Sequence, residues 1–249
     1  KMRKVFLTMI LAVFATAASF SMSEYRTHLM SVNEDIGVIA DSPSIVKGSS
    51  GVVLRSFGNG LKSIIARAVV DSKHASTASV HFEVYSALKQ SSLPVPNFTP
   101  QAGDEVVLNY LYDRSLIIAP NAEVYNQVVE VFSNITFVHP DLVGAMLSMD
   151  YKPNPSQDDF RRACALNAAG LIFIALDGKS MFVDCGSFSI LKSFKSGQIA
   201  QYHLPFYTRV RDINTVFWKL DGEHINNYDK YYRFLLNTDE NTGKIESAK

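Results

Sequence analysis

Few residues in this chain could do chemistry, and its two cysteines come first. Cys164 and Cys185 are the only cysteines among 249 residues. In an oxidising compartment such a pair could form a disulfide. By constraining the unfolded chain, the bond would raise the free energy of unfolding by about 3 kcal/mol. Against this, Cys164 occupies an apolar position of an expected helix, where a buried free thiol behaves as a small hydrophobic side chain. The sequence leaves both the bridge and the free thiol open.

Cys185 could also act as a nucleophile, because it stands in the sequence Asp184-Cys185-Gly186-Ser187. A cysteine nucleophile needs a base that lowers its pKa, and His139 or His203 would have to supply it. Nothing in the spacing places either histidine near Cys185. The sequence therefore favours a tight turn at this position and a protein that is not an enzyme.

The six histidines predict no metal site. None of them has a second histidine four residues away, and none clusters with the cysteines. His139 and His203 each stand beside a proline motif, where histidines more often cap turns. The stretch Gly48-Ser49-Ser50-Gly51 lacks the lysine and hydroxyl residue of a phosphate-binding loop, so it too is interpreted as a turn. No cofactor is expected.

Composition indicates a folded protein without a nucleic-acid partner. Apolar residues make up 47% of the chain and charged residues 19%, enough for a packed core. Lysine plus arginine equals aspartate plus glutamate, at 24 each. No basic stripe that could follow a phosphate backbone is present.

Residues 1–21 are predicted to be a secretory signal peptide. Basic residues at Met2-Arg3-Lys4 precede the ten-residue apolar run Val5–Phe14, and small residues follow at Ala15–Ser19. The protein is therefore expected to be exported, to the periplasm, the outer membrane or the cell surface. The alternative is an uncleaved membrane anchor over Val5–Met22, which is at the short end for a membrane span.

The cleavage site is left open. Small residues allow cleavage after Ala17, Ser19 or Ser21, and the pattern does not choose among them.

The rest of the chain predicts an α+β fold, with a small β-barrel-like N-terminal half followed by a helix-plus-antiparallel-meander half. The expected subdomains are residues 22–120 and 121–236, followed by a flexible polar tail at 237–249. The stretch Gln101–Asn121 is expected to join the halves. It contains two apolar runs separated by Asp113-Arg114, which indicates either a hairpin or two consecutive core strands.

Short apolar or β-branched runs bounded by turn residues predict the strands of the first half. These are Met30–Val32, Gly37–Ala40, Gly51–Phe57, Ser63–Val70, Ser79–Val84 and Glu105–Leu111.

Helical spacing begins after Asn121, and a meander follows. Four helices are expected. The first contains Tyr125 and Val128, and the second runs through Pro140–Met149. The third begins at the N-cap Ser156, with Asp159 three residues on, and the fourth contains the aromatic run from Tyr228. The expected strands are Leu171–Leu176, Ser180–Val183 and Phe188–Phe194, with a turn at Asp177-Gly178 and a further strand within Val210–Leu220.

Five motifs carry a resemblance. They are GDEVVLNYLYDRSLIIAPN at Gly103–Asn121, VHPD at Val138–Asp141, the phenylalanine after Asp158-Asp159, VDCGSF at Val183–Phe188 and LPFYTRV at Leu204–Val210. Together they resemble the N-terminal domain of the plasminogen-binding surface proteins of Helicobacter and Campylobacter relatives. The resemblance covers about residues 22–236.

This resemblance implies an exported cell-envelope protein that captures host plasminogen through lysines in its C-terminal part. In this sequence only Lys249 matches such a terminal lysine, and Lys244 lies nearby in the sequence. A free C-terminal lysine carries an ammonium and a carboxylate, the zwitterion that plasminogen kringle domains bind between charged centres and an aromatic trough. Membrane association at the envelope fits this interpretation, and no oligomeric state is indicated.

The alternative function is a periplasmic structural or assembly adaptor of the envelope that has no host ligand.

Overall fold

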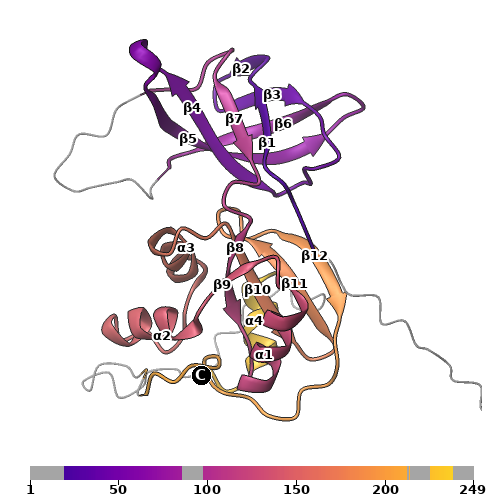
Figure 1. The fold of residues 1–249 in the computed structure, drawn as a ribbon, viewed down its shortest axis with the longest axis vertical. Coiled ribbons are helices and arrows are strands. Elements are labelled where there is room, and N and C mark those ends of the chain that lie inside the picture. Colours follow the sequence, from indigo (N-terminus) through magenta and orange to yellow (C-terminus); the bar gives the residue numbers. More distant parts are fainter. Residues whose placement is uncertain (1–19, 86–97, 212, 214–224, 238–249) are drawn as a thin grey trace, which may run out of the picture.

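The computed structural model describes residues 20–85, 98–211, 213 and 225–237. A β-rich half lies above a second half in which helices surround another sheet (Figure 1). This arrangement confirms the predicted α+β fold with a barrel-like first half. No helix in these residues is long and apolar enough to cross a membrane.

Three predictions fall wholly or mainly outside the described residues. They are the signal peptide at 1–21, the strand within Val210–Leu220 and the polar tail at 237–249.

The first half is a seven-stranded antiparallel sheet in the order β1-β7-β4-β5-β6-β3-β2. Its strands are β1 (Tyr25–His28), β2 (Ser31–Asn33), β3 (Ile36–Ala40), β4 (Ser50–Ser56), β5 (Lys62–Lys73), β6 (Thr77–Glu83) and β7 (Glu105–Leu108). A short 3-10 helix, η1 (Gly58–Gly60), connects β4 to β5.

The two ends of this order are neighbours in the chain. Only Leu29 and Met30 separate β1, which pairs with β7, from β2, which pairs with β3. Leu29 N donates to Asp104 O (2.9 Å) and Met30 N donates to Val38 O (2.8 Å), so pairing continues through the bend. This bent segment closes the sheet, which explains the barrel-like shape.

The second half is a five-stranded mixed sheet in the order β12-β11-β10-β8-β9. Its strands are β8 (Arg114–Ile118), β9 (Thr136–Val138), β10 (Leu171–Leu176), β11 (Lys179–Asp184) and β12 (Ile190–Lys195). The helices of the described part are α1 (Ala122–Val131), α2 (Pro140–Met149), α3 (Gln157–Leu166) and α4 (Tyr228–Leu235). β8 runs parallel to both β9 and β10, whereas β10, β11 and β12 form the predicted antiparallel meander.

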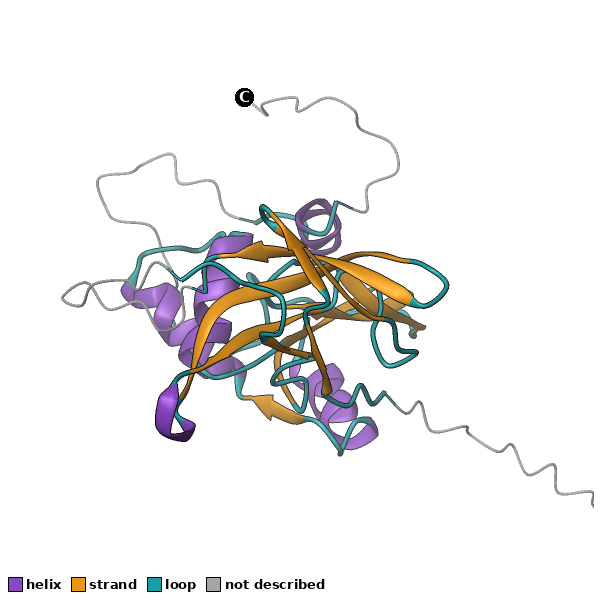
Figure 2. Ribbon diagram, turned by 90° about the horizontal axis from the view of Figure 1, so that it is seen from above, coloured by secondary structure: helices purple, strands orange, loops and turns teal. Residues whose placement is uncertain are grey.

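Both faces of this second sheet are buried. Leu116 and Ile172 belong to a core formed with α2, α3 and α4, whereas Ile117 and Phe173 belong to a core formed with α1. Helices accordingly lie on both sides of the strands in the orthogonal view (Figure 2). A sheet covered on both faces needs apolar residues at every position, which explains the uninterrupted run Leu171–Leu176.

Side-chain caps fix where the helices begin. Asn121, His139 and Asn227 each accept a hydrogen bond from a backbone N–H in the first turn of α1, α2 and α4. At α3 the predicted pair is present as a complete capping box, with Ser156 and Asp159 each bonding the other's backbone N–H.

The stretch Gln101–Asn121 forms two consecutive strands and not a hairpin. β7 belongs to the first sheet and β8 to the second, so the sheets divide between Leu108 and Arg114. Positive φ angles at Asn109 (56°) and Leu111 (61°) turn the chain between them. β8 thus precedes the predicted subdomain limit at residue 120 although it belongs to the second sheet.

Candidate functional site

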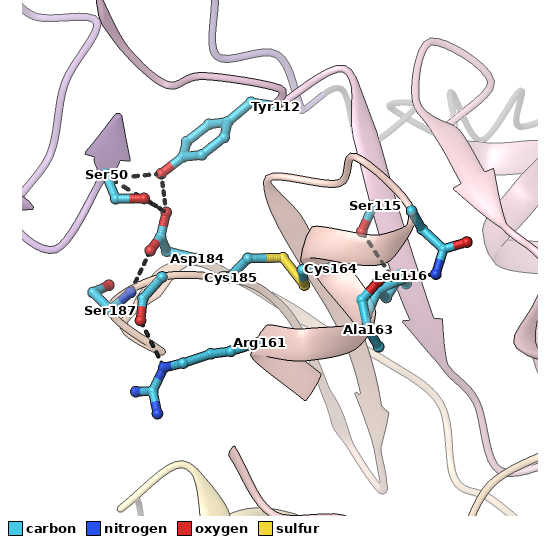
Figure 3. Close-up of a disulfide and its surroundings, with 12 residues drawn as sticks. Ser50, Tyr112, Ser115, Leu116, Arg161, Ala163, Cys164, Asp184, Cys185 and Ser187 are labelled. Atoms are coloured by element: carbon cyan, nitrogen blue, oxygen red, sulfur yellow. Dashed lines mark hydrogen bonds between the residues drawn. A yellow bond between two sulfur atoms is a disulfide. The ribbon is translucent and has the colours of Figure 1, made fainter. Parts of the chain in front are cut away.

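One buried carboxylate, that of Asp184 at the end of β11, lies where the two sheets meet (Figure 3). The residue is 0% exposed. One of its oxygens accepts hydrogen bonds from Tyr112 Oη (2.6 Å), Ser50 Oγ (2.7 Å) and Ser50 N (3.2 Å). Ser187 N donates to the other oxygen (2.6 Å). A buried carboxylate is costly unless it is hydrogen-bonded, so these donors hold both halves of the protein around it.

Tyr112 is the donor that links the chain between the sheets to this carboxylate. Burial, followed by the charge of Asp184 and the hydrogen bond to it, raises the pKa of Tyr112 well above its ordinary value. The phenol therefore keeps its proton and donates it. Its oxygen also accepts from Ser50 N (3.0 Å), so one hydroxyl contacts β4 and Asp184 together.

Glycines let the two halves approach closely at this junction. Ser187 Oγ donates to Gly48 O (2.6 Å), and a Cβ on Gly48 would lie 2.3 Å from Ser189 Cβ. A Cβ on Gly186 would lie 3.1 Å from Ser50 Oγ. Gly48-Ser49-Ser50-Gly51 is thus the turn and strand start that the sequence indicated, and it also forms the contact surface for the second half.

A disulfide lies beside the carboxylate and joins α3 to the residue after β11 (Figure 3). Its sulfur atoms, from Cys164 and Cys185, are 2.02 Å apart, and the two Cα atoms are 6.2 Å apart. Arg161 Nε donates to Gly186 O (2.8 Å) next to it. In this bond Cys185 has no free thiol to act as a nucleophile, and residues 184–187 form a structural turn.

A second cluster lies where β8 and β9 end and where α1 and α2 begin. The ring of His139 meets Tyr125 edge-on at 5.4 Å, and Tyr125 lies 5.7 Å from Tyr207. Tyr207 N donates to Ala119 O (2.7 Å), which places the LPFYTRV motif beside the end of the Gly103–Asn121 motif. The two motifs are far apart in the sequence and meet only in the fold.

Asp141 holds this second cluster together through hydrogen bonds. Its carboxylate accepts hydrogen bonds from Thr208 Oγ1 (2.9 Å), Arg209 N (2.8 Å) and Arg209 Nε (2.7 Å). Although burial acts to raise it, the pKa of Asp141 is lowered by these hydrogen bonds. The charged carboxylate therefore links α2 to the loop that follows His203.

A cleft of about 390 Å³ with a mixed polar and apolar lining opens beside the junction. The N-terminal segment lines it with Met22 and Glu24, and Asn109, Asp113 and Asn134 complete much of the wall. Asn109 Nδ2 donates to two backbone carbonyl oxygens, so this side chain also ties the N-terminal segment to the first half.

The structure describes only some of the residues that the sequence predicted to form sites. Lys244 and Lys249 lie outside the described residues. In the described residues, no three or more His, Cys, Asp and Glu side chains are grouped to hold a metal ion. The sequence analysis missed the bonding of Ser50, Tyr112 and Asp184, because 62 and 134 positions separate Ser50 from its partners. The available signal was that Tyr112 and Asp184 lie inside two of the resembling motifs.

Comparison with known proteins gives one consistent result. Residues 24–236 match a family described as "Plasminogen-binding protein pgbA N-terminal". Two curated relatives, both named plasminogen-binding protein PgbA and both from Helicobacter pylori (strains J99 and 26695), are 29% and 28% identical over 163 residues. Each match covers 64% of this chain but only 36% and 35% of the relatives, about a third of their length. No solved structure matches.

Replacing Tyr112 by Phe removes one hydrogen bond to a buried charge. We expect the free energy of unfolding to fall by about 1.5–3 kcal/mol, measured by urea denaturation. Tyr110→Phe is the matched control, because the Tyr110 hydroxyl makes no hydrogen bond to a described residue, and it should cost less than about 0.5 kcal/mol. Equal losses in the two variants would contradict the role assigned to Asp184.

The disulfide closes a loop of 21 positions. We expect the double variant Cys164→Ala/Cys185→Ala to lose about 3 kcal/mol of unfolding free energy relative to the oxidised protein. Mass spectrometry after thiol labelling of the denatured, unreduced protein should find no labelled cysteine. Two labelled cysteines would show that the bridge does not form, and reduced wild type serves as the positive control.

Proposed function

The chain belongs to the family described as plasminogen-binding protein PgbA N-terminal, and we propose that it is an exported cell-envelope protein that captures plasminogen through Lys244 and Lys249. The family match carries this proposal, because it runs from residue 24 to residue 236 and includes both halves of the fold. The match spans only about a third of the relatives' length, so their plasminogen binding cannot simply be transferred. The proposal that this chain binds plasminogen therefore names lysines of this chain itself.

Lysine chemistry supports the proposed partner. A lysine ammonium is a compact charge on a flexible stem, which suits an anionic centre flanked by aromatic rings. A kringle domain offers such a site, and an adjacent carboxylate on the ligand would pair with its cationic centre. Lys244 and Lys249 supply the ammonium groups in this proposal.

The folded domain gives these lysines a fixed point of attachment. Tyr232 Oη on α4 donates to Pro205 O (2.9 Å), and Gln157 Nε2 on α3 donates to Leu235 O (2.6 Å). Leu235 and Leu236 are buried in the core formed with α2 and α3. The chain therefore leaves a well-anchored helix end before it reaches Lys244.

Replacing both lysines should abolish most of the capture. We expect Lys244→Ala/Lys249→Ala to bind immobilised plasminogen at least about tenfold more weakly than wild type, because each ammonium pairs with a kringle carboxylate. Surface plasmon resonance measures the affinity, and 6-aminohexanoic acid should compete with the wild-type protein.

The matched control, Lys47→Ala/Lys230→Ala, removes two exposed lysines from the folded domain and should bind like wild type. Unchanged binding in the Lys244/Lys249 variant would refute the proposed contact residues, whether or not the lysine analogue competes.

Export to the cell surface can be tested separately from binding. A receptor for a host protein must be reachable from outside, so added protease should degrade this protein on intact cells. A periplasmic marker enzyme in the same cells should stay intact. If the protein is degraded only after the outer membrane is opened, the alternative of a periplasmic adaptor with no host ligand is favoured.

A further inference from the structure

The N-terminal segment at residues 20–24 connects the two halves of the protein a second time. It leads into β1 of the first sheet, and Figure 1 shows it (indigo) running from β1 down to the second half. Its side chains alternate: Phe20 is buried and Met22 is half-buried, whereas Ser21 and Ser23 are exposed. Such alternation is typical of an extended chain that lies with one face against a surface.

Phe20 anchors this segment in the core formed with α1. Its ring stacks on the ring of Phe182, with the centroids 4.0 Å apart and the planes 14° apart. Asn134 Nδ2 donates to Phe20 O (2.7 Å), so the backbone is held as well. Phe20 is only 6% exposed, and Met22 packs against the same core. Without Phe20, part of the apolar surface of Phe182 would be returned to water.

The other end of the segment is attached to the first half. Asn109 Nδ2 donates both to Ser23 O (2.9 Å) and to Ser44 O (2.8 Å), and Ser44 lies in the connection between β3 and β4. β1 then pairs with β7. The segment therefore runs from the core of the second half to the sheet of the first, and it does so only in a chain that still contains Phe20.

This placement bears on the membrane anchor that the apolar N-terminal sequence allows. An anchor over Val5–Met22 would need Phe20 and Met22 in the bilayer, yet both side chains pack in the folded domain. An anchor that ended before Phe20 would have only the fifteen residues Val5–Ser19. A helix needs about 20 apolar residues to cross the hydrocarbon core, so this shorter run favours a signal peptide that is removed.

The same placement separates the three candidate cleavage sites. A cut after Ala17, Ser19 or Ser21 has small residues at the first and third positions before the bond, so the sequence allows each. A cut after Ser21 would discard Phe20 and leave Phe182 without its stacked partner. A cut after Ala17 or Ser19 keeps the whole segment.

We propose that the chain is cut before Phe20 on export, after Ala17 or Ser19, and that residues 20–24 of the mature protein form a strap between the two halves. The cut is a hydrolysis by a membrane-bound peptidase of the export pathway. Water adds across one peptide bond, so residue 17 or 19 leaves as a carboxylate and Ala18 or Phe20 carries the new α-amino group. This inference rests on the proposed export and adds which bond is cut and what the retained residues do.

N-terminal sequencing of the exported protein tests the proposal. The full chain is produced in a Gram-negative host, and the protein of the periplasmic and envelope fractions is sequenced and weighed by mass spectrometry. We expect the first residue to be Ala18 or Phe20. An exported chain that begins beyond Phe20, or that still carries Val5–Phe14, would overturn the proposal and leave export standing. Protein found only in the cytoplasm with its N-terminus intact would refute the proposed export itself.

Two leucine variants test the choice of bond. Residue 17 is the first residue before one proposed cut and the third before the other, so Ala17→Leu removes a required small residue from both sites. Its uncut precursor should accumulate in a pulse-chase experiment. Ser21→Leu alters only the third candidate site and should be processed like wild type. If Ser21→Leu blocks processing, the cut lies after Ser21 and the proposal fails.

The strap is tested in the exported protein by thermal unfolding. Phe20→Ala removes the ring that covers Phe182, and the Tm should fall by at least about 6 °C. Ser21→Ala is the matched control, since its side chain is exposed, and it should change the Tm by less than about 2 °C. Phe20→Leu keeps an apolar side chain and should lie between the two. A Tm for Phe20→Ala equal to that of wild type would overturn the strap.

Discussion

The buried carboxylate of Asp184 holds the two halves of this protein together. It accepts hydrogen bonds from Ser50 of the first sheet, from Tyr112 of the connecting chain and from its own turn at Ser187. In a low-dielectric junction an unpaired charge would cost far more than one hydrogen bond contributes, so all the donors must be in place together. This requirement sets the orientation of the barrel-like half on the second sheet.

The surrounding covalent and steric features reinforce the same junction. The disulfide ties α3 to the turn that carries Asp184, and glycines remove the Cβ atoms that would hold the halves apart. Hydrogen bonds to Asp141 also link the VHPD motif to the LPFYTRV motif. Several of the resembling motifs therefore act by joining elements of the scaffold.

The described fold fixes the helix that precedes the proposed plasminogen-binding lysines. α4, from whose end the chain leads to Lys244 and Lys249, packs on one face of the second sheet.

Local signals in the sequence determined much of the second half. Ser156 and Asp159 predicted the capped start of α3, and Asp177-Gly178 predicted the hairpin of β10 and β11, because these features depend on hydrogen bonds and dihedral angles within a few residues. Only the tertiary structure decided that β1 and β2 close the first sheet, that β8 lies between β9 and β10, and that Tyr112 meets Asp184. These pairings join segments far apart in the chain, and no residue spacing records which distant partner a strand or a buried charge will find.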